Sequence, residues 1–273
     1  MPELPEVETV ARLVRPRLVG RKIEGVRVSW ERSLGGLDAR TFRSRITGSF
    51  VKRVGRRAKW IVFDLERCGA PAGHLLCHLR MSGRLYLSPF PEHLYMRAAL
   101  SLDNGQHLVF ADVRKFGRLI LAESLEEALP SLGPDANTDE VDGAWMEREL
   151  RKRKRALKPL LLDQSFLAGL GNIYVDEALW QAKIHPQAIT NTIGKIRCIK
   201  LCIAIKDVLK RAIKYKGTTI IDFRYGSNEK GRFKKELKVF GRIKKPCSRC
   251  NIPIDKIFVS QRGTYYCKKC QRI

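Results

Sequence analysis

The sequence predicts an α+β protein of several domains: an N-terminal helix with an antiparallel β-sandwich, then a helical domain, then a C-terminal β-hairpin zinc finger. Apolar residues follow helical spacing at the start of the chain and strand-like spacing from there to residue 121. Helical spacing returns from residue 125 onward, and four cysteines in two Cys-x2-Cys pairs stand near the C-terminus. One helix beside a run of antiparallel strands is typical of a β-sandwich.

The first helix is predicted by apolar residues at helical spacing, with a glycine as its stop: Val7, Val10, Ala11, Val14, Leu18 and Gly20. Pro5 suits a first-turn position, and Glu6 lies near the positive end of the helix dipole.

The strands are expected within residues 22–30, 49–66, 74–87 and 97–121, which are rich in Val, Ile, Leu and Phe. Asp103-Asn104-Gly105 is a hairpin turn signal. The helices of the second part are expected at residues 144–157, 159–164, 172–183 and 193–215. Residues 217–241 lack periodicity, and we expect a mobile loop there.

The net charge of +25 indicates a polyanionic partner. Residues 1–121 carry 22 Lys and Arg against 11 Asp and Glu, and residues 151–273 carry 30 against 8. Residues 122–150 carry one against nine, so an acidic strip separates two basic blocks. This pattern is expected of a linker turned away from a nucleic acid that both blocks contact.

The chain has no apolar run near the roughly 18 residues that suggest a membrane span, and its acidic start does not resemble a secretion signal. We therefore expect a reducing, cytoplasmic location, with nucleoid association if the source is bacterial, and no membrane partner. In such a compartment cysteines bind metal or stay free.

The cysteine spacing predicts one structural Zn²⁺ ion, bound by Cys247, Cys250, Cys267 and Cys270. Four thiolates leave no open coordination position for a substrate, so the site is not catalytic. The remaining cysteines are expected to be buried free thiols: Cys68, Cys77, Cys198 and Cys202.

Pro2 and Glu3 form a candidate catalytic pair. If Met1 is removed, Pro2 becomes a secondary amine that can be unprotonated near neutral pH, since a free α-amino group titrates at about 7.7–8.0. Such an amine can attack an electrophilic carbon while the acid transfers protons. Taken alone, the same stretch favours an ordinary helix entry over a catalytic pair.

Several further residues are of types that can contact phosphates or bases of a nucleic acid. Gly171 and Asn172 open a helix, where free N–H groups and an amide can hold a phosphate, although an ordinary Asn cap is the alternative. Met81, Arg114 and Phe116 stand near strand ends, where an exposed Met or Phe beside Arg can wedge into stacked bases instead of joining the core.

Together these motifs resemble the formamidopyrimidine-DNA glycosylases of base-excision repair over the whole chain. The resemblance is carried by an ordered set of segments: residues 2–8, 57–59, 78–83, 112–117, 157–159, 171–174, 217–219 and 261–263, with the four cysteines. It implies a catalytic β-sandwich domain at residues 1–122 and an acidic linker at 123–143. It further implies a helix–two-turns–helix DNA-binding domain at 144–238, whose residues 217–238 cap the lesion, and a zinc finger at 239–273.

The resemblance implies a bifunctional hydrolase and lyase that removes oxidised purines, chiefly 8-oxoguanine and formamidopyrimidines, from double-stranded DNA through a Schiff base. The catalytic residues would be Pro2 as nucleophile and Glu3 as proton donor, with Lys59 and Arg262. The implied DNA contacts are Lys59, Met81, His93, Arg114, Phe116, Lys158, Asn172 and Arg262. The implied capping residues are Thr218, Thr219 and Tyr225. The enzyme is expected to act as a monomer without an organic cofactor.

The sequence departs from the family where Ala58 replaces a frequent Gly and where Lys216 replaces the first Gly of the usual Gly-Gly-Thr-Thr. Ile221 and residues 227–230 also depart from the usual capping loop, which bears on lesion preference.

Two alternatives remain. An endonuclease VIII-like glycosylase for oxidised pyrimidines is disfavoured by Leu4 together with Met81, Arg114 and Phe116. A non-catalytic zinc-ribbon nucleic-acid binder explains the charge and the cysteines but gives no function to Pro2 and Glu3.

Overall fold

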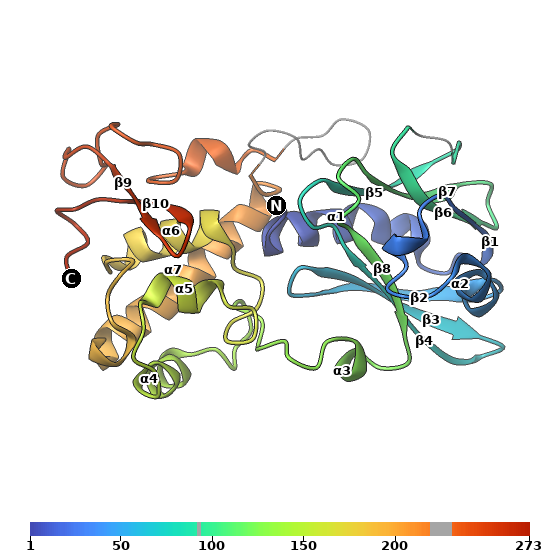
Figure 1. Ribbon diagram of the computed structural model, residues 1–273, viewed down its shortest axis with the longest axis horizontal. Helices are drawn as coiled ribbons and strands as arrows, with labels where there is room; N and C mark the ends of the chain where they lie inside the picture. The colour runs from blue at the N-terminus through green and yellow to red at the C-terminus, as the bar shows by residue number, and fades with distance from the viewer. Residues whose placement is uncertain (92–93, 219–230) are drawn as a thin grey trace. The chain divides into compact units, whose positions relative to one another are not determined.

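The computed structural model describes residues 1–91, 94–218 and 231–273, and the chain divides into two units (Figure 1). The first unit comprises Met1–Pro130 and Lys216–Arg232, and the second comprises Ser131–Tyr215 and Phe233–Ile273.

The first unit is a β-sandwich of two four-stranded antiparallel sheets, ordered β1-β6-β7-β5 and β2-β3-β4-β8. Val, Leu, Ile and Phe side chains from both sheets meet in one core. The strands are β1 (Ile23–Val28), β2 (Phe50–Arg57), β3 (Trp60–Arg67), β4 (Ala70–His78), β5 (Gly83–Ser88), β6 (Met96–Leu102), β7 (His107–Asp112) and β8 (Arg118–Ala122). This confirms the predicted sandwich.

Helix α1 (Leu4–Leu18) contributes its apolar stripe to the same core. Val7, Val14 and Leu18 are buried there, which explains their helical spacing. Glu3 is the N-cap residue, and its backbone N–H donates to the Glu6 carboxylate at 2.8 Å. This contact satisfies one of the donors that a helix start leaves open, and it fixes the backbone of the N-terminal residues.

Helix α2 (Ala39–Ile46) was not predicted. Its signals are an Asp38 N-cap, whose carboxylate accepts the Thr41 N–H at 2.8 Å, and the buried pair Phe42 and Ile46 one turn apart. Eight residues with three arginines gave too weak an apolar pattern to register. A 3-10 helix (Glu31–Ser33) and the short helix α3 (Leu125–Ala128) complete this unit's helices among the described residues.

The second unit contains α4 (Gly143–Arg151), α5 (Leu157–Leu162), α6 (Asn172–Ala182) and α7 (Lys195–Lys214), with 3-10 helices at Thr190–Thr192 and Phe233–Glu236. The prediction of a single helix over residues 144–157 was wrong, because α4 ends at Arg151 and α5 begins at Leu157. The N–H groups of Leu157 and Lys158 donate to the carbonyls of Ala188 and Pro186 rather than to a preceding turn.

The C-terminal hairpin consists of β9 (Asp255–Val259) and β10 (Arg262–Tyr266), near the positions expected for it. Its small core joins Trp180 of α6 to Val239, Ile254 and two cysteines. The Glu177 carboxylate of α6 accepts the N–H groups of Lys238, Val239 and Phe240, which fixes the segment leading into the zinc-finger region. Within the described part of the chain, no helix has both the length and the apolar character to cross a bilayer.

Candidate functional site

Pro2 and Glu3 are both buried at the start of α1. The Glu6 carboxylate accepts the N–H of Glu3 through one oxygen at 2.8 Å and the N–H of Thr218 through the other at 2.7 Å. Thr218 is itself buried and forms an isolated bridge with Arg232. One buried carboxylate therefore fixes the backbone of the Pro2–Glu3 pair and the base of the segment predicted to cap the lesion.

Lys59 lies in the turn between β2 and β3 and is largely buried. The neighbouring His78, at the end of β4, packs edge-on against the Trp60 ring at 4.7 Å, and its Nδ1 accepts the Arg80 N–H at 3.0 Å. Burial, together with the positive charges of Arg80 and Lys59, lowers the pKa of His78 to about 3. His78 is consequently neutral at physiological pH.

The turns that carry Met81 and Arg114 are joined by Asp112. Its carboxylate accepts the Ser82 hydroxyl at 2.5 Å, the Arg114 N–H at 3.1 Å and the Gly117 N–H at 2.7 Å. A Cβ at Gly117 would lie 2.4 Å from the Phe110 ring, so only glycine fits this close approach. The predicted wedge residues thus come from two turns that are held together.

The side chains on these turns are exposed. Met81 is 46% and Phe116 47% exposed, so neither side chain is part of the core. The Arg114 guanidinium lies over the Phe116 ring at 4.9 Å, which preorganises a cation beside an apolar plate. The geometry favours a contact surface over the core alternative for these residues.

In the second unit, the side chain of Asn172 forms a hydrogen bond with Gly263, the residue that follows Arg262. The Asn172 amide donates to the Gly263 carbonyl at 2.9 Å, so the exposed Arg262 stands beside the start of α6. Gly171, not Asn172, is the N-cap residue, which removes the ordinary Asn-cap interpretation. Asn172 instead links the helix start to the hairpin.

Lys158 is 0% exposed, and its ammonium donates to Asp176 at 2.6 Å, Thr264 at 2.8 Å and the Gly263 carbonyl at 3.3 Å. Burial raises the pKa of the Asp176 carboxyl to about 7, although the Lys158 ammonium lowers it. The sequence predicted a DNA contact for Lys158. This geometry gives it no exposed surface, and a role in positioning Gly263 fits its place better.

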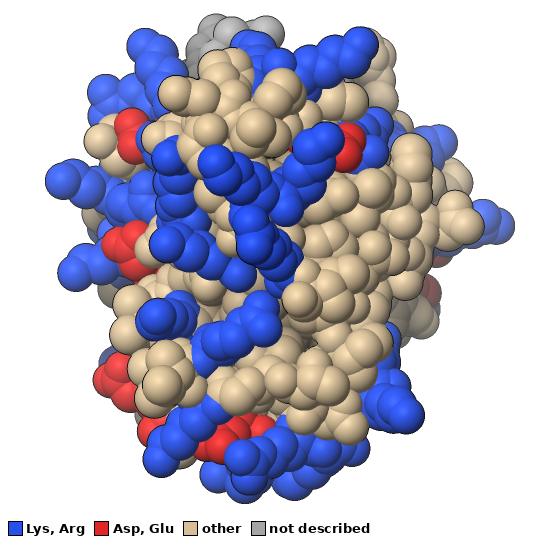
Figure 2. Space-filling view, turned by 90° about the vertical axis from the view of Figure 1, so that its left-hand side faces the viewer, with Lys and Arg blue, Asp and Glu red and all other residues tan. Residues whose placement is uncertain are grey.

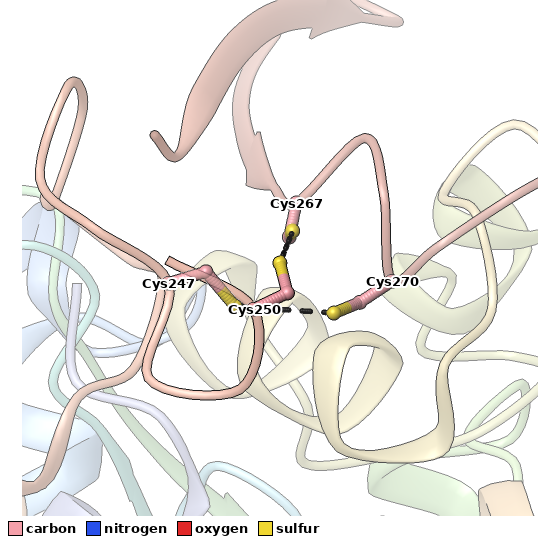
Figure 3. A group of neighbouring side chains, drawn as sticks. All are labelled: Cys247, Cys250, Cys267 and Cys270. Carbon is pink, nitrogen blue, oxygen red and sulfur yellow. Dashed lines mark hydrogen bonds between the residues drawn. The ribbon is translucent and has the colours of Figure 1, made fainter. Parts of the chain in front are cut away.

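The four predicted zinc ligands converge from two loops, with their sulfurs turned toward one another (Figure 3). The Cys247 and Cys270 sulfurs are 4.0 Å apart, those of Cys250 and Cys267 are 3.4 Å apart, and all four lie within 4.8 Å. Tetrahedral Zn–S bonds of about 2.3 Å place sulfurs about 3.8 Å apart. The cluster therefore fits one structural zinc ion.

The thiols also have the electrostatics of a cation site. Burial and the neighbouring sulfurs raise the pKa of Cys270 to about 12, because adjacent thiolates repel one another. Burial also opposes ionisation of Cys247, but hydrogen bonds from backbone N–H groups and the Trp180 indole outweigh it and lower its pKa to about 6. A divalent cation stabilises all four sulfurs as thiolates.

Of the other cysteines, Cys77, Cys198 and Cys202 are buried, as expected. Cys68 is exposed, which corrects the prediction. It lies in the turn between β3 and β4, where its backbone has φ of +51°.

His93, Thr219 and Tyr225 lie outside the described residues, as do Ile221 and residues 227–230. Ala58 and Lys216, which replace glycines frequent in the family, have similar backbone geometry. Ala58 has φ of +50° and Lys216 has φ of +58°, both in the left-handed region that glycine adopts most easily. This backbone conformation is a steric reason for glycine at either position, and in this chain Ala58 and Lys216 adopt it with a side chain present.

Sequence reasoning missed Asp112, Asp176 and the contact that Glu6 makes with Thr218. Asp112 opens a segment quoted for its neighbours and Asp176 lies just after another, and no local pattern marks a carboxylate whose partners are distant in sequence. The basic surface, in contrast, was predicted from the charge counts of the sequence. On the face formed by the second unit, Lys and Arg predominate over Asp and Glu (Figure 2).

Family models match along most of the chain. The formamidopyrimidine-DNA glycosylase N-terminal domain matches residues 1–119, the H2TH domain of these enzymes matches residues 132–224, and the zinc finger found in FPG and IleRS matches residues 244–273.

Individual proteins with this name also match the chain over its full length. The formamidopyrimidine-DNA glycosylase of Enterococcus faecalis is 38% identical over 279 residues, covering 100% of this chain and 98% of that protein. Wild-type Lactococcus lactis Fpg, in a crystal structure with N7-benzyl-Fapy-dG DNA, is 36% identical with a TM-score of 0.89 and 100% coverage of both chains. MutM in complex with carbocyclic 8-oxo-G DNA is 36% identical with a TM-score of 0.87, again with 100% coverage of both chains. The chain therefore belongs to the formamidopyrimidine-DNA glycosylase family.

Proposed function

We propose that this protein is a base-excision repair glycosylase that removes 8-oxoguanine and formamidopyrimidines from double-stranded DNA and then cleaves the strand as an abasic-site lyase. The observation that carries the proposal is the full-length match to named glycosylases, combined with a Pro2–Glu3 pair held at the start of α1. The zinc finger and the net charge of +25 support DNA as the substrate.

Pro2 supplies the nucleophile once Met1 is removed. Its nitrogen lone pair attacks C1′ of the damaged nucleotide, the bond from C1′ to the base breaks, and the base leaves with a proton that it has gained. Glu3 is the proton donor of this exchange. Glu6 acts as a positioning residue, because its contact with the Glu3 N–H orients the pair.

After the base has left, the Pro2 nitrogen loses its proton and the sugar ring opens, because the C1′–O4′ bond breaks and O4′ takes up a proton. An iminium ion between Pro2 and C1′ of the opened sugar results. The positive nitrogen acidifies C2′, so loss of a C2′ proton expels the 3′ phosphate, and a second elimination expels the 5′ phosphate. Hydrolysis of the iminium frees the amine. These steps need no redox cofactor. Lys59 and Arg262 are proposed to assist them by holding phosphates and transferring protons.

Phosphate binding in the second unit is assigned to Asn172 and Arg262. Their support is the shared hairpin, since Asn172 and Lys158 both donate to the Gly263 carbonyl. A phosphate at the start of α6 also benefits from the N–H groups and dipole of the helix. Lys158 is assigned to positioning within this group.

We assign to Met81, Arg114 and Phe116 the contacts with the gap that the extruded nucleotide leaves in the duplex. Extruding a nucleotide costs a few kcal/mol, which side chains inserted into the stack offset. Met81 is proposed to fill the gap, Arg114 to contact the unpaired cytosine and Phe116 to wedge the neighbouring step. Their exposure and the Ser82–Asp112 bond between their turns support this assignment.

His93 is proposed as a further DNA contact, and Thr218, Thr219 and Tyr225 as residues of the capping segment. We further propose that the enzyme works as a monomer in the cytoplasm, associated with the nucleoid where the host is bacterial.

An excision assay with defined duplexes tests the function. Oligonucleotides carrying 8-oxoguanine, a formamidopyrimidine or thymine glycol opposite the normal partner base are incubated with enzyme, and free base and strand breaks are measured. We expect both purine lesions to be excised faster than thymine glycol. The reverse order would identify an endonuclease VIII-like enzyme, and tight binding without excision would identify a non-catalytic zinc-ribbon binder.

A further inference from the structure

The hairpin β9–β10 has two different faces. Directly paired residues of antiparallel strands project to the same side, so the pairs Phe258–Gly263 and Lys256–Tyr265 share one face. The other face carries Val259 and Thr264, which are buried. Phe258 is 71% exposed, so the first face points outward.

The outward face is open around the Phe258 ring. Gly263, directly opposite, has no side chain to cover it. A Cβ at Gly263 would lie 3.2 Å from the Lys256 Cε atom, so the Lys256 stem crosses the hairpin above the glycine. The Lys256 ammonium lies 5.2 Å from the Phe258 ring centroid and 5.7 Å from that of Tyr265.

This face is also rigidly supported. Tyr265 packs edge-on against Phe240 at 5.0 Å, and its N–H donates to the buried Asp176 at 2.9 Å. Phe240 is fixed by the bond from its N–H to Glu177. The fold therefore fixes Tyr265 on this face, and the bare Phe258 ring lies on the same face with Lys256 between the two rings.

We propose that Phe258 and Lys256 form a stacking site for an unpaired nucleobase, so that the hairpin binds single-stranded DNA on the face that carries Phe258. An exposed aromatic ring stacks on any base, and an adjacent cation can bind the backbone phosphate. The large positive charge of the chain favours a nucleic acid over an apolar protein as the ligand. The proposal depends on the proposed function in one respect, the choice of DNA as the polymer that binds here.

Binding of two probes to the zinc-loaded full chain tests the site: fluorescent oligothymidylate, and an equally long oligomer of abasic tetrahydrofuran nucleotides with the same charge. Fluorescence anisotropy gives both affinities. We expect wild type to prefer the base-containing probe, and Phe258→Ala to weaken its binding about fivefold or more and to abolish the preference. Phe258→Trp should keep the preference, because indole also stacks.

Matched variants separate stacking from general effects. Ile196→Ala removes an apolar side chain that is 70% exposed in the same unit, and it should leave both affinities unchanged. Lys256→Ala should weaken both probes, and by more than Lys268→Ala, which removes an exposed charge from the same zinc-finger region without touching Phe258.

Equal wild-type affinities for the two probes would overturn the proposal, as would a Phe258→Ala variant that retains the preference for bases. The assay requires no excision, so a chain that stacks bases but removes no oxidised purine would contradict the proposed function alone. Excision of 8-oxoguanine without base-dependent binding of oligothymidylate would contradict only the stacking site.

Discussion

The Glu6 carboxylate accepts the backbone N–H of Thr218 at 2.7 Å, and this contact joins the first helix to a residue 212 positions later in the chain. The other oxygen of the same carboxylate accepts the Glu3 N–H. Both of these N–H donors belong to segments proposed to act on the damaged nucleotide.

Glu6→Gln tests this arrangement. The amide has one acceptor oxygen, so one buried N–H would face an NH2 group and lose its partner, at a cost of about 1–3 kcal/mol. We expect a lower Tm and a base-excision rate reduced about ten- to a hundredfold, because the catalytic pair is displaced. Glu8→Gln is the control, since Glu8 bonds Arg12 and Arg56 instead. Wild-type Tm and excision rate in Glu6→Gln would refute the positioning role.

Asp112→Asn tests the junction that carries the proposed wedge. Oδ1 of Asp112 accepts from Ser82 and Arg114, and Oδ2 accepts from Gly117. Asn has one acceptor oxygen, so the bonds to one of these oxygens are lost and the junction of the two turns should loosen. We expect 8-oxoguanine excision to become less selective for cytosine in the opposite strand, measured as rates opposite each of the natural bases. Asp103→Asn, in the turn between β6 and β7, is the matched control. Unchanged selectivity in Asp112→Asn would separate Arg114 from base recognition.

His78 predicts a specific dependence of stability on pH. Its pKa is about 3 in the folded protein against 6.5 for the free side chain, so the unfolded chain takes up a proton that the folded chain excludes. The stabilisation is present above pH 6.5 and is lost as the pH falls toward 3, at up to about 1.4 kcal/mol per pH unit.

His78→Asn should flatten this dependence, because Asn offers an acceptor near the position of Nδ1 but does not titrate. Denaturant unfolding of both proteins at a series of pH values below 6.5 measures the difference. Parallel curves for the two proteins would show that His78 does not exclude its proton on folding.

Cys250→Ser, or removal of zinc with a chelator, should unfold the zinc-finger region and release Arg262 from its position beside Asn172. We expect loss of bound zinc and markedly weaker duplex binding by anisotropy, with the N-terminal amine intact. Cys68→Ser is the control, since Cys68 is exposed and distant in sequence from the cluster. Full duplex affinity without zinc would exclude the hairpin from DNA binding.

The sequence predicted those features whose signal is local. Two Cys-x2-Cys pairs have a spacing that zinc binding requires, and the alternation of apolar residues follows from strand geometry. Helix α2 escaped because Phe42 and Ile46 are its only buried residues, too few to establish a period.

The features that could not be predicted depend on contacts between distant residues. Lys158 meets Thr264 across 106 positions, and nothing near Lys158 distinguishes a buried ammonium from a surface one. Asp112 resembles any turn aspartate until Ser82, 30 positions earlier, is brought to it by the pairing of β5 with β7. A family resemblance supplies the type of side chain at such positions, whereas the fold supplies its partners.

Borohydride trapping on duplex DNA containing 8-oxoguanine, followed by peptide mass spectrometry, tests the central role of Pro2 most directly. A covalent DNA adduct is expected on a mature N-terminal Pro2. The adduct should be lost when residues are added before Pro2, but not when the same residues are added at the C-terminus. An adduct on another residue, or full strand cleavage by a chain whose Pro2 nitrogen is blocked, would contradict this role of Pro2.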